Sequence, residues 1–118
     1  RIIRVKPIEA EMAKLALNSL ALIKVVFAEE IYDLTEHFRA DYKNIYKIFQ
    51  LDQNVNERHL LAGKDGYRGA SGKCLSKDAD FLLAFSGASN MGLLKLAIEL
   101  NKHYLKKGID NEKKSIQR

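Results

Sequence analysis

The sequence predicts an all-α protein in which one very long N-terminal helix packs with several shorter helices, and a long connecting helix ends the chain. Apolar residues recur at helical spacing from Ile8 to Phe38, a stretch without glycine or proline. The same spacing returns between Met91 and Lys107. No segment alternates polar and apolar residues with the period of two that is typical of strands. We therefore expect helices to make up all of the regular structure.

The long N-terminal helix is expected to start beside Pro7, a residue that the first turn of a helix tolerates. At 1.5 Å per residue it would reach about 45 Å before it ends near Arg39. From Leu15 to Ala28 almost every residue is apolar. Three polar residues interrupt this part, namely Asn18, Ser19 and Lys24. A surface helix needs only one apolar stripe, so we expect burial against the helix's own domain and against a second copy of the chain.

Two shorter helices are expected next. Asp41 should cap a helix through Gln50, because its carboxylate can accept a hydrogen bond from a free backbone amide of the first turn. A third helix is expected from Asn54 to Leu61. The glycine-rich stretch from Gly63 to Gly72 then forms the long loop of the chain.

The C-terminal part is expected to hold two further helices. Ser76 should cap a helix from Lys77 to about Ser86, which the segment SGASN then ends. The helix that follows from Met91 should end at Gly108, because glycine readily adopts the left-handed conformation found at helix C-termini. The residues after it are polar and should fray.

Composition indicates one globular domain. The 118 residues include 47% apolar and 30% charged residues. The net charge is +5, but residues 101–118 account for most of it with six basic and two acidic residues, so nucleic-acid binding is not expected. Apolar runs are far shorter than a membrane span, and the start does not resemble a signal peptide, although the chain begins at Arg1. We expect a cytoplasmic protein without membrane contact.

The cysteine and the histidines indicate no metal site. Cys74 is the one cysteine, so it cannot form an internal disulfide. His37, His59 and His103 show no ligand spacing with one another or with Cys74, so no metal is expected.

Cys74 stands in the segment GASGKCLSKD, residues 69–78, where two interpretations are open. Glycines precede it, Lys73 and Lys77 flank it, and the expected helix begins two or three residues later. Nearby cations and helix N-termini favour the thiolate, the reactive form of cysteine, so Cys74 can be a nucleophile. The alternative is an ordinary cysteine at a tight turn.

Three polar residues could assist such a thiol. Asp78 could act as a base or orient water, or it could simply interact with the helix dipole. On the long helix, Glu11, Lys14 and Asn18 form one polar stripe. Asn18 interrupts apolar sequence and could set register at a helix interface or hold a substrate oxygen. Lys14 could stabilise developing negative charge.

These segments together resemble the UDP-glucose/GDP-mannose dehydrogenase family. The stretch PIEAEMAKLALNSLALIKVVFAEEI resembles the start of the family's central domain, with an E-x-E-x-x-K-x-x-x-N pattern on a very long helix. GKDGYRGASGKCLSKD is similar to the glycine-rich active-site segment, whose core reads G-[FY]-G-G-x-C-x-P-K-D. LLKLAIELN resembles the helix that leads to the C-terminal domain. The resemblance implies a central helical domain over residues 1–90 and a connecting helix with a polar tail over residues 91–118.

The resemblance implies an NAD-dependent nucleotide-sugar 6-dehydrogenase acting on a UDP- or GDP-linked sugar. In the family, a primary alcohol is oxidised to the aldehyde and then to the acid, with two NAD molecules reduced. The cysteine holds the carbon first as a thiohemiacetal and then as a thioester, and Cys74 would be this nucleophile. Lys14 and Asn18 would bind the substrate and stabilise oxyanion character, and Asp78 would orient or deprotonate water. Lys77 would help to position the substrate.

Four positions depart from the family pattern. Ala70 stands where an aromatic residue is usual, Ser71 replaces a glycine and Ser76 replaces a proline. Glu29 replaces a common asparagine. Ser71 matters most for the substrate, since its side chain could narrow the sugar pocket or supply a new hydroxyl contact.

The resemblance also implies parts that this sequence does not contain. Family members have an N-terminal NAD-binding domain with G-x-G-x-x-G and a C-terminal nucleotide-sugar domain, so the chain resembles the middle third of an enzyme and would be inactive alone. The family's central domain forms the subunit interface, which implies a homodimer through the long helix. The product would feed polysaccharide biosynthesis. The alternative is a non-catalytic helical dimerisation or scaffold module derived from the family.

Overall fold

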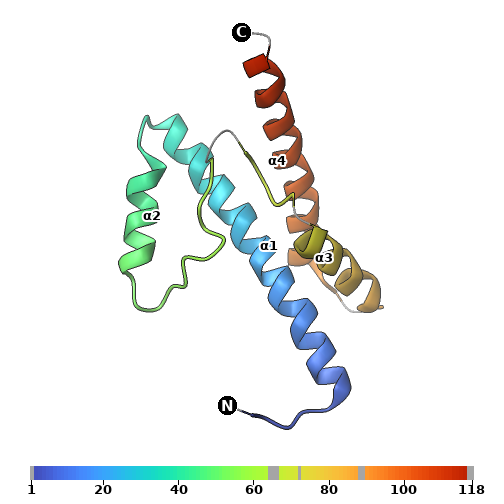
Figure 1. Ribbon diagram of the computed structural model, residues 1–118. Helices are drawn as coiled ribbons and strands as arrows, with labels where there is room; N and C mark the ends of the chain where they lie inside the picture. Colours follow the sequence, from blue (N-terminus) through green and yellow to red (C-terminus); the bar gives the residue numbers. More distant parts are fainter. Residues whose placement is uncertain (1, 64–66, 72, 88–89, 117–118) are drawn as a thin grey trace.

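The computed structural model describes residues 2–63, 67–71, 73–87 and 90–116, with the backbone alone for residue 73 and residues 109–116. Four helices follow one another: α1 (Pro7–His37), α2 (Tyr42–Leu51), α3 (Lys73–Phe85) and α4 (Gly92–Ile116). The described ranges hold no strand, and the all-α prediction is confirmed. α1 contacts each of the other three helices, with α2 on one side of it and α3 and α4 on the other (Figure 1).

α1 has the extent that the sequence predicts. Pro7 is its first residue, where no backbone N–H is needed, and the Glu9 carboxylate accepts a 2.8 Å hydrogen bond from the Lys6 amide. At the other end Arg39 adopts a φ of +54°, and the Ala40 amide donates to the Thr35 carbonyl at 2.8 Å. None of the described helices, α1 included, combines the length and the apolar character needed to cross a membrane.

Two apolar clusters hold the helices together on opposite sides of α1. The first joins α1 to α3, α4 and the loop before α3 through Leu15, Leu22, Ala70, Ala79, Leu82, Leu94 and Ile98. The second joins α1 to α2 and the segment after it through Ala28, Tyr42, Leu60 and Ala62. Complete burial of one such aliphatic side chain stabilises a fold by about 1.5–3 kcal/mol. Both clusters therefore depend on α1.

α2 confirms the predicted cap. The Asp41 carboxylate accepts a 2.9 Å hydrogen bond from the Lys43 amide, and the helix ends at Leu51, one residue beyond the prediction. Tyr42, Ile45 and Phe49 face the second cluster.

The predicted helix from Asn54 to Leu61 is wrong. Side chains in this segment bind backbone amides two residues ahead, from Asp52 to Asn54 at 2.8 Å and from Asn56 to Arg58 at 3.0 Å. Such local turns compete with helix formation. His59 adopts a φ of +71°, which no right-handed helix allows. The segment therefore forms turns.

α3 begins earlier than predicted. It starts at Lys73, so Cys74 lies in its first turn and not ahead of it. Ser76 lies inside the helix and is not its N-cap; its hydroxyl donates to the Ala70 carbonyl at 3.4 Å and accepts from the Asn101 amide at 3.3 Å. The end at Phe85 agrees with the predicted interruption by SGASN.

α4 continues past the predicted end at Gly108 and reaches Ile116, through the polar residues expected to fray. Gly108 is therefore not a C-cap. Its missing side chain serves packing, because a Cβ there would lie 3.1 Å from the backbone nitrogen of Arg68. The loop before α3 can approach α4 closely at this point.

Candidate active site

Asn18 and Asp78 link α1 to α3. The Asn18 Nδ2 atom donates a 2.6 Å hydrogen bond to Asp78 Oδ2, and both residues are half-buried. The two side chains meet because the helices pack through apolar neighbours, among them Leu15 and Ala79. Hydrogen bonds to an ionised carboxylate are roughly twice as strong as neutral ones. The polar interruption of α1 thus has a charged partner on α3.

The hydrogen bond joins two of the predicted site residues, and two others lie one turn away from it on the same helices. Lys14 lies one turn before Asn18 on α1, and Cys74 lies one turn before Asp78 on α3. Residues four apart share one side of a helix, so Lys14 lies on the side of α1 that carries Asn18, and Cys74 on the side of α3 that carries Asp78. Lys14 and Cys74 are exposed. The structure thus joins the half-buried amide and carboxylate directly, whereas a shared site for Lys14 and Cys74 stays a prediction.

Ser71 and Lys77 lie close to Cys74 in the chain. Ser71 is exposed in the loop that leads into α3, and Lys77 is exposed three residues after Cys74, on the same side of the helix. Both are accessible to a ligand that approaches the thiol from solvent. Their contacts with a substrate stay predictions.

The donors of this site suit a developing oxyanion. Asn18 has two amide hydrogens, of which Asp78 takes one. The Lys14 ammonium supplies further donors one turn away. Donors of this kind stabilise oxyanions, and the role of Lys14 and Asn18 toward a substrate stays a prediction.

Comparison with known proteins identifies the family. The model of the UDP-glucose/GDP-mannose dehydrogenase family, central domain, matches residues 8–103. The chain belongs to this family. All six predicted site residues lie inside the matched range, namely Lys14, Asn18, Ser71, Cys74, Lys77 and Asp78.

The family's curated members include similar proteins from Rickettsia. A protein of Rickettsia conorii named UDP-glucose 6-dehydrogenase is 32% identical over 97 residues, which cover 80% of this chain and 22% of that protein. Its namesake in Rickettsia bellii is 35% identical over 71 residues, or 60% of this chain and 15% of that protein. The chain thus spans about a fifth or less of these relatives. No solved structure matches it.

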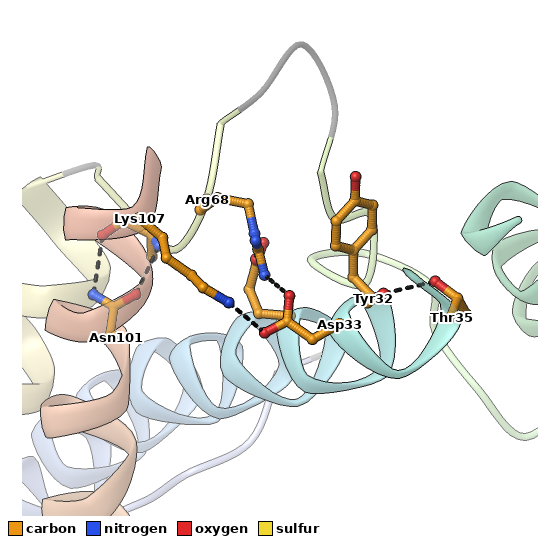
Figure 2. A network of polar contacts seen from close by, with 8 residues as sticks. Tyr32, Asp33, Thr35, Arg68, Asn101 and Lys107 are labelled. Atoms are coloured by element: carbon orange, nitrogen blue, oxygen red, sulfur yellow. Dashed lines mark hydrogen bonds and ion pairs between the residues drawn. The ribbon is translucent and has the colours of Figure 1, made fainter. Parts of the chain in front are cut away.

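A buried ion-pair network beside the loop was not predicted from the sequence. Arg68, only 8% exposed, donates to the Glu29 carboxylate and, at 2.6 Å, to that of Asp33. Lys107 of α4 donates to the other Asp33 oxygen at 2.9 Å (Figure 2). One feature of the sequence could have indicated this network. Glu29 replaces the family's asparagine, and a carboxylate that becomes buried requires a cation.

Charges within the network support one another. Burial acts to raise the pKa of Asp33, but hydrogen bonds from Lys107 and Arg68 outweigh it and hold the pKa below its ordinary value. Burial likewise acts to lower the pKa of Arg68, and the bonds to Glu29 and Asp33 raise it instead. The rings of Tyr32 and Tyr104 lie 4.9 and 5.3 Å from the guanidinium. Arg68 is therefore fixed from α1 and α4 together.

A second unpredicted residue, Asn101, binds the loop directly. Its Oδ1 accepts from the Ala70 amide at 2.8 Å, and its Nδ2 donates to the Ala70 carbonyl at 3.1 Å. The segment LLKLAIELN drew attention to this helix, but nothing in the sequence indicates the partner of its last residue.

Among the described residues there is neither a cluster of metal ligands nor a strand that could lead into a dinucleotide-binding turn. They contain no group of three or more His, Cys, Asp or Glu side chains placed to hold a metal ion. A dinucleotide fold presents the pyrophosphate to a glycine-rich turn between a strand and a helix, whereas the glycine-rich loop here follows turns within the described helical part.

Proposed function

We propose that this chain is the central domain of an NAD-dependent nucleotide-sugar 6-dehydrogenase of the UDP-glucose to UDP-glucuronate type. The observation that carries this proposal is the Asn18–Asp78 hydrogen bond. It joins the helix of the E-x-E-x-x-K-x-x-x-N pattern to the helix of the cysteine segment. The names of the Rickettsia relatives support the substrate class. The cofactor and the nucleotide would be held outside the described helices.

Cys74 is the proposed nucleophile. Its thiolate adds to the aldehyde carbon of the half-oxidised sugar, and the carbonyl electron pair moves onto oxygen. Lys14 and the free N–H of Asn18 donate to that oxygen. NAD supplies the hydride acceptor in this chemistry.

Asp78 is the proposed base for release of the acid. Water attacks the acyl carbon, the carbon–sulfur bond breaks, and sulfur leaves as the thiolate. The Asp78 oxygen that does not bind Asn18 accepts the proton of the water. Its other oxygen keeps the Asn18 amide oriented through both steps.

Ser71 and Lys77 are proposed substrate contacts. Both are exposed near Cys74. Lys77 would act through its charge on the nucleotide sugar, and the Ser71 hydroxyl would bind the sugar where the family has glycine. A cytoplasmic location and a role in polysaccharide biosynthesis follow from such a substrate.

The proposal includes a homodimer through α1. Leu20, Phe27 and Leu34 are 54%, 50% and 51% exposed and recur every seven residues, so they share one side of the helix. A groove of about 290 Å³ adjoins this side, and Leu20, Ile23 and Leu93 are among its lining residues. Contiguous exposed apolar surface is typical of protein interaction sites.

The test uses the protein expressed from the complete reading frame. We expect Cys74→Ser and Cys74→Ala to stop NAD-dependent formation of the sugar acid, measured by NADH absorbance and product chromatography. Ser86→Ala, at the far end of α3, is the control and should keep activity. Undiminished acid formation in the Cys74 variants would overturn the cysteine assignment.

One outcome would favour a scaffold module instead. The departures at Ala70, Ser71 and Ser76 lie around Cys74 and are the observation behind that alternative. It predicts that the unsubstituted protein forms dimers but oxidises neither UDP-glucose nor GDP-mannose.

A further inference from the structure

Asn101 is a buried polar residue whose side chain binds the loop before α3 and Ser76 within that helix. It is 3% exposed and belongs to α4. It binds both the N–H and the C=O of Ala70, at 2.8 and 3.1 Å (Figure 2). Two bonds to one residue fix the orientation of its backbone as well as its position. An apolar side chain would suffice if this place only required packing.

Ser76, in the first turn of α3, binds both Ala70 and Asn101. Its hydroxyl donates to the Ala70 carbonyl at 3.4 Å and accepts from Asn101 Nδ2 at 3.3 Å. We refer to Ala70, Ser76 and Asn101 as the loop clip. Cys74 lies between Ala70 and Ser76 in the sequence, so the clip holds the chain on both sides of the thiol.

The loop also has no room to move toward α4. Gly69 has a φ of +73°, and a Cβ there would lie 3.0 Å from Asn101 Oδ1. Gly108 faces the backbone of Arg68, where a Cβ would lie 3.1 Å from the nitrogen. Close contact limits motion in one direction, and the hydrogen bonds of Asn101 limit it in the other.

We propose that Asn101 and Ser76 are positioning residues for Cys74. By fixing Ala70 against the first turn of α3, the loop clip sets where that turn begins and hence where the thiol lies relative to the Asn18–Asp78 pair. This inference rests on the proposed function only for its catalytic consequence; the structural coupling stands without it.

The first experiment compares Asn101→Leu, Ser76→Ala and the control Lys102→Ala, an exposed neighbour on α4, by NMR of the 118-residue chain. A pocket of about 180 Å³ lined by Leu22, Ile98 and Leu105 borders Asn101, so leucine can be accommodated. We expect amide exchange in residues 74–78 to rise on the order of tenfold or more in Asn101→Leu and less in Ser76→Ala. The Asn18 side-chain amide signal should shift in both variants, although neither residue touches it.

Amides of α2 serve as the internal reference in the same spectra. A global loss of stability would raise exchange in α2 as much as in residues 74–78, and that result would overturn the proposal. An unchanged Asn18 signal in a folded Ser76→Ala or Asn101→Leu variant would overturn it too. Ser76→Ala removes only a hydroxyl, so it keeps the test valid if Asn101→Leu does not fold.

The second experiment measures kcat and KM in the protein from the complete reading frame. Misplacing a reacting group by about 1 Å can cost on the order of a hundredfold in rate. We expect Asn101→Leu to lower kcat at least tenfold with little change in KM, and Lys102→Ala to change neither. A kcat of Asn101→Leu equal to that of the unsubstituted protein would contradict the catalytic role of the loop clip. Absence of turnover in the unsubstituted protein would instead count against the proposed function, while the NMR result still decides the coupling.

Discussion

Asn18 and Asp78 stand 60 positions apart in the sequence, yet their side chains meet at 2.6 Å between α1 and α3. Lys14 lies one turn before Asn18 on α1, and Cys74 lies one turn before Asp78 on α3. Each of these residues has an ordinary explanation when taken alone. The hydrogen bond between Asn18 and Asp78 is the contact that links the two helices of the candidate site.

Substitution of Asp78 should separate its structural role from its chemical role. Asp78→Ala leaves the half-buried Asn18 amide without its partner, so we expect the free energy of unfolding to fall by about 1–2 kcal/mol in urea titrations. Asp78→Asn keeps an acceptor and should cost less. Both should lower acid formation on the order of a hundredfold in the protein from the complete reading frame. Asp80→Ala, an exposed residue of the same helix, is the control. Wild-type stability in Asp78→Ala would contradict the importance of the bond.

Introducing charged residues on the exposed apolar side of α1 should prevent self-association. We expect light scattering at tens of micromolar to show a dimer for the unsubstituted chain and a monomer for the double variant Leu20→Glu, Phe27→Glu, because two buried unpaired charges oppose the interface. Ile48→Glu is the matched control, since Ile48 is 63% exposed on α2, away from this side. A monomer in the unsubstituted chain would rule out the interface.

Loss of Arg68 should be costly, because it leaves the Glu29 carboxylate buried without its partner. We expect Arg68→Met to lower the free energy of unfolding by about 3–5 kcal/mol. Adding Glu29→Gln removes the unpaired charge, so the double variant should be more stable than Arg68→Met alone. The double-mutant cycle, measured by urea unfolding, should give a coupling of about 1–3 kcal/mol. Additive effects would mean that the two side chains do not interact.

Asp33 should make the fold sensitive to acid. Its pKa is lowered below its ordinary value of 3.8 in the folded chain, where burial is outweighed by Lys107 and Arg68. The folded state then binds fewer protons than the unfolded state around that pH. The contribution of Asp33 is complete above 3.8 and is lost as the pH falls through the folded value. Urea midpoints measured across this range should fall less steeply for Asp33→Asn than for the unsubstituted chain; parallel curves would contradict the assignment.

Gly108→Ala should destabilise, against the usual trend. Inside a helix this change normally stabilises by about 0.5–1 kcal/mol. Here the new Cβ would lie 3.1 Å from the Arg68 nitrogen, and Arg68 is held by its ion pairs and cannot withdraw. We expect a lower thermal midpoint. Gly92→Ala, whose Cβ would lie 3.4 Å from the side-chain oxygen of Asn90, is the control and should be neutral or stabilising. A higher thermal midpoint for Gly108→Ala would show that the loop at Arg68 moves to accommodate the new methyl group.

Local patterns in the sequence predicted the four observed helices but not all of their ends, and they also predicted one helix that does not form. The apolar period predicts α1, and the Asp41 cap predicts α2, because each depends on neighbours in the chain. The expected helix over Asn54–Leu61 ignored side chains that bind backbone amides two residues ahead. Gly108 is a typical end signal, yet its role is a contact with a distant loop.

The candidate site, like the helices, could be predicted only in part from the sequence. The spacing of Lys14 and Asn18 follows helix periodicity, so the sequence pairs them on one helix, whereas Cys74 was expected ahead of the helix that carries Asp78. The roles of Arg68 and Asn101 depend on partners more than thirty residues away, and no local pattern encodes such a pairing. The sequence showed that Glu29 departs from the family pattern, but it did not show that Arg68 is the cation that pairs with it.

The dependence of the loop on Asn101 and Gly108 has a consequence for the order in which the chain is made. Asp78, the last of the side chains proposed to react, is synthesised 30 residues before Gly108. The contact that seats Ala70 spans 31 positions toward the C-terminus. Until that part of α4 exists, the loop before the thiol lacks its hydrogen bonds to Asn101, so the site reaches its final arrangement late in synthesis. A domain boundary drawn at residue 90 would therefore cut away the surface on which the cysteine segment settles.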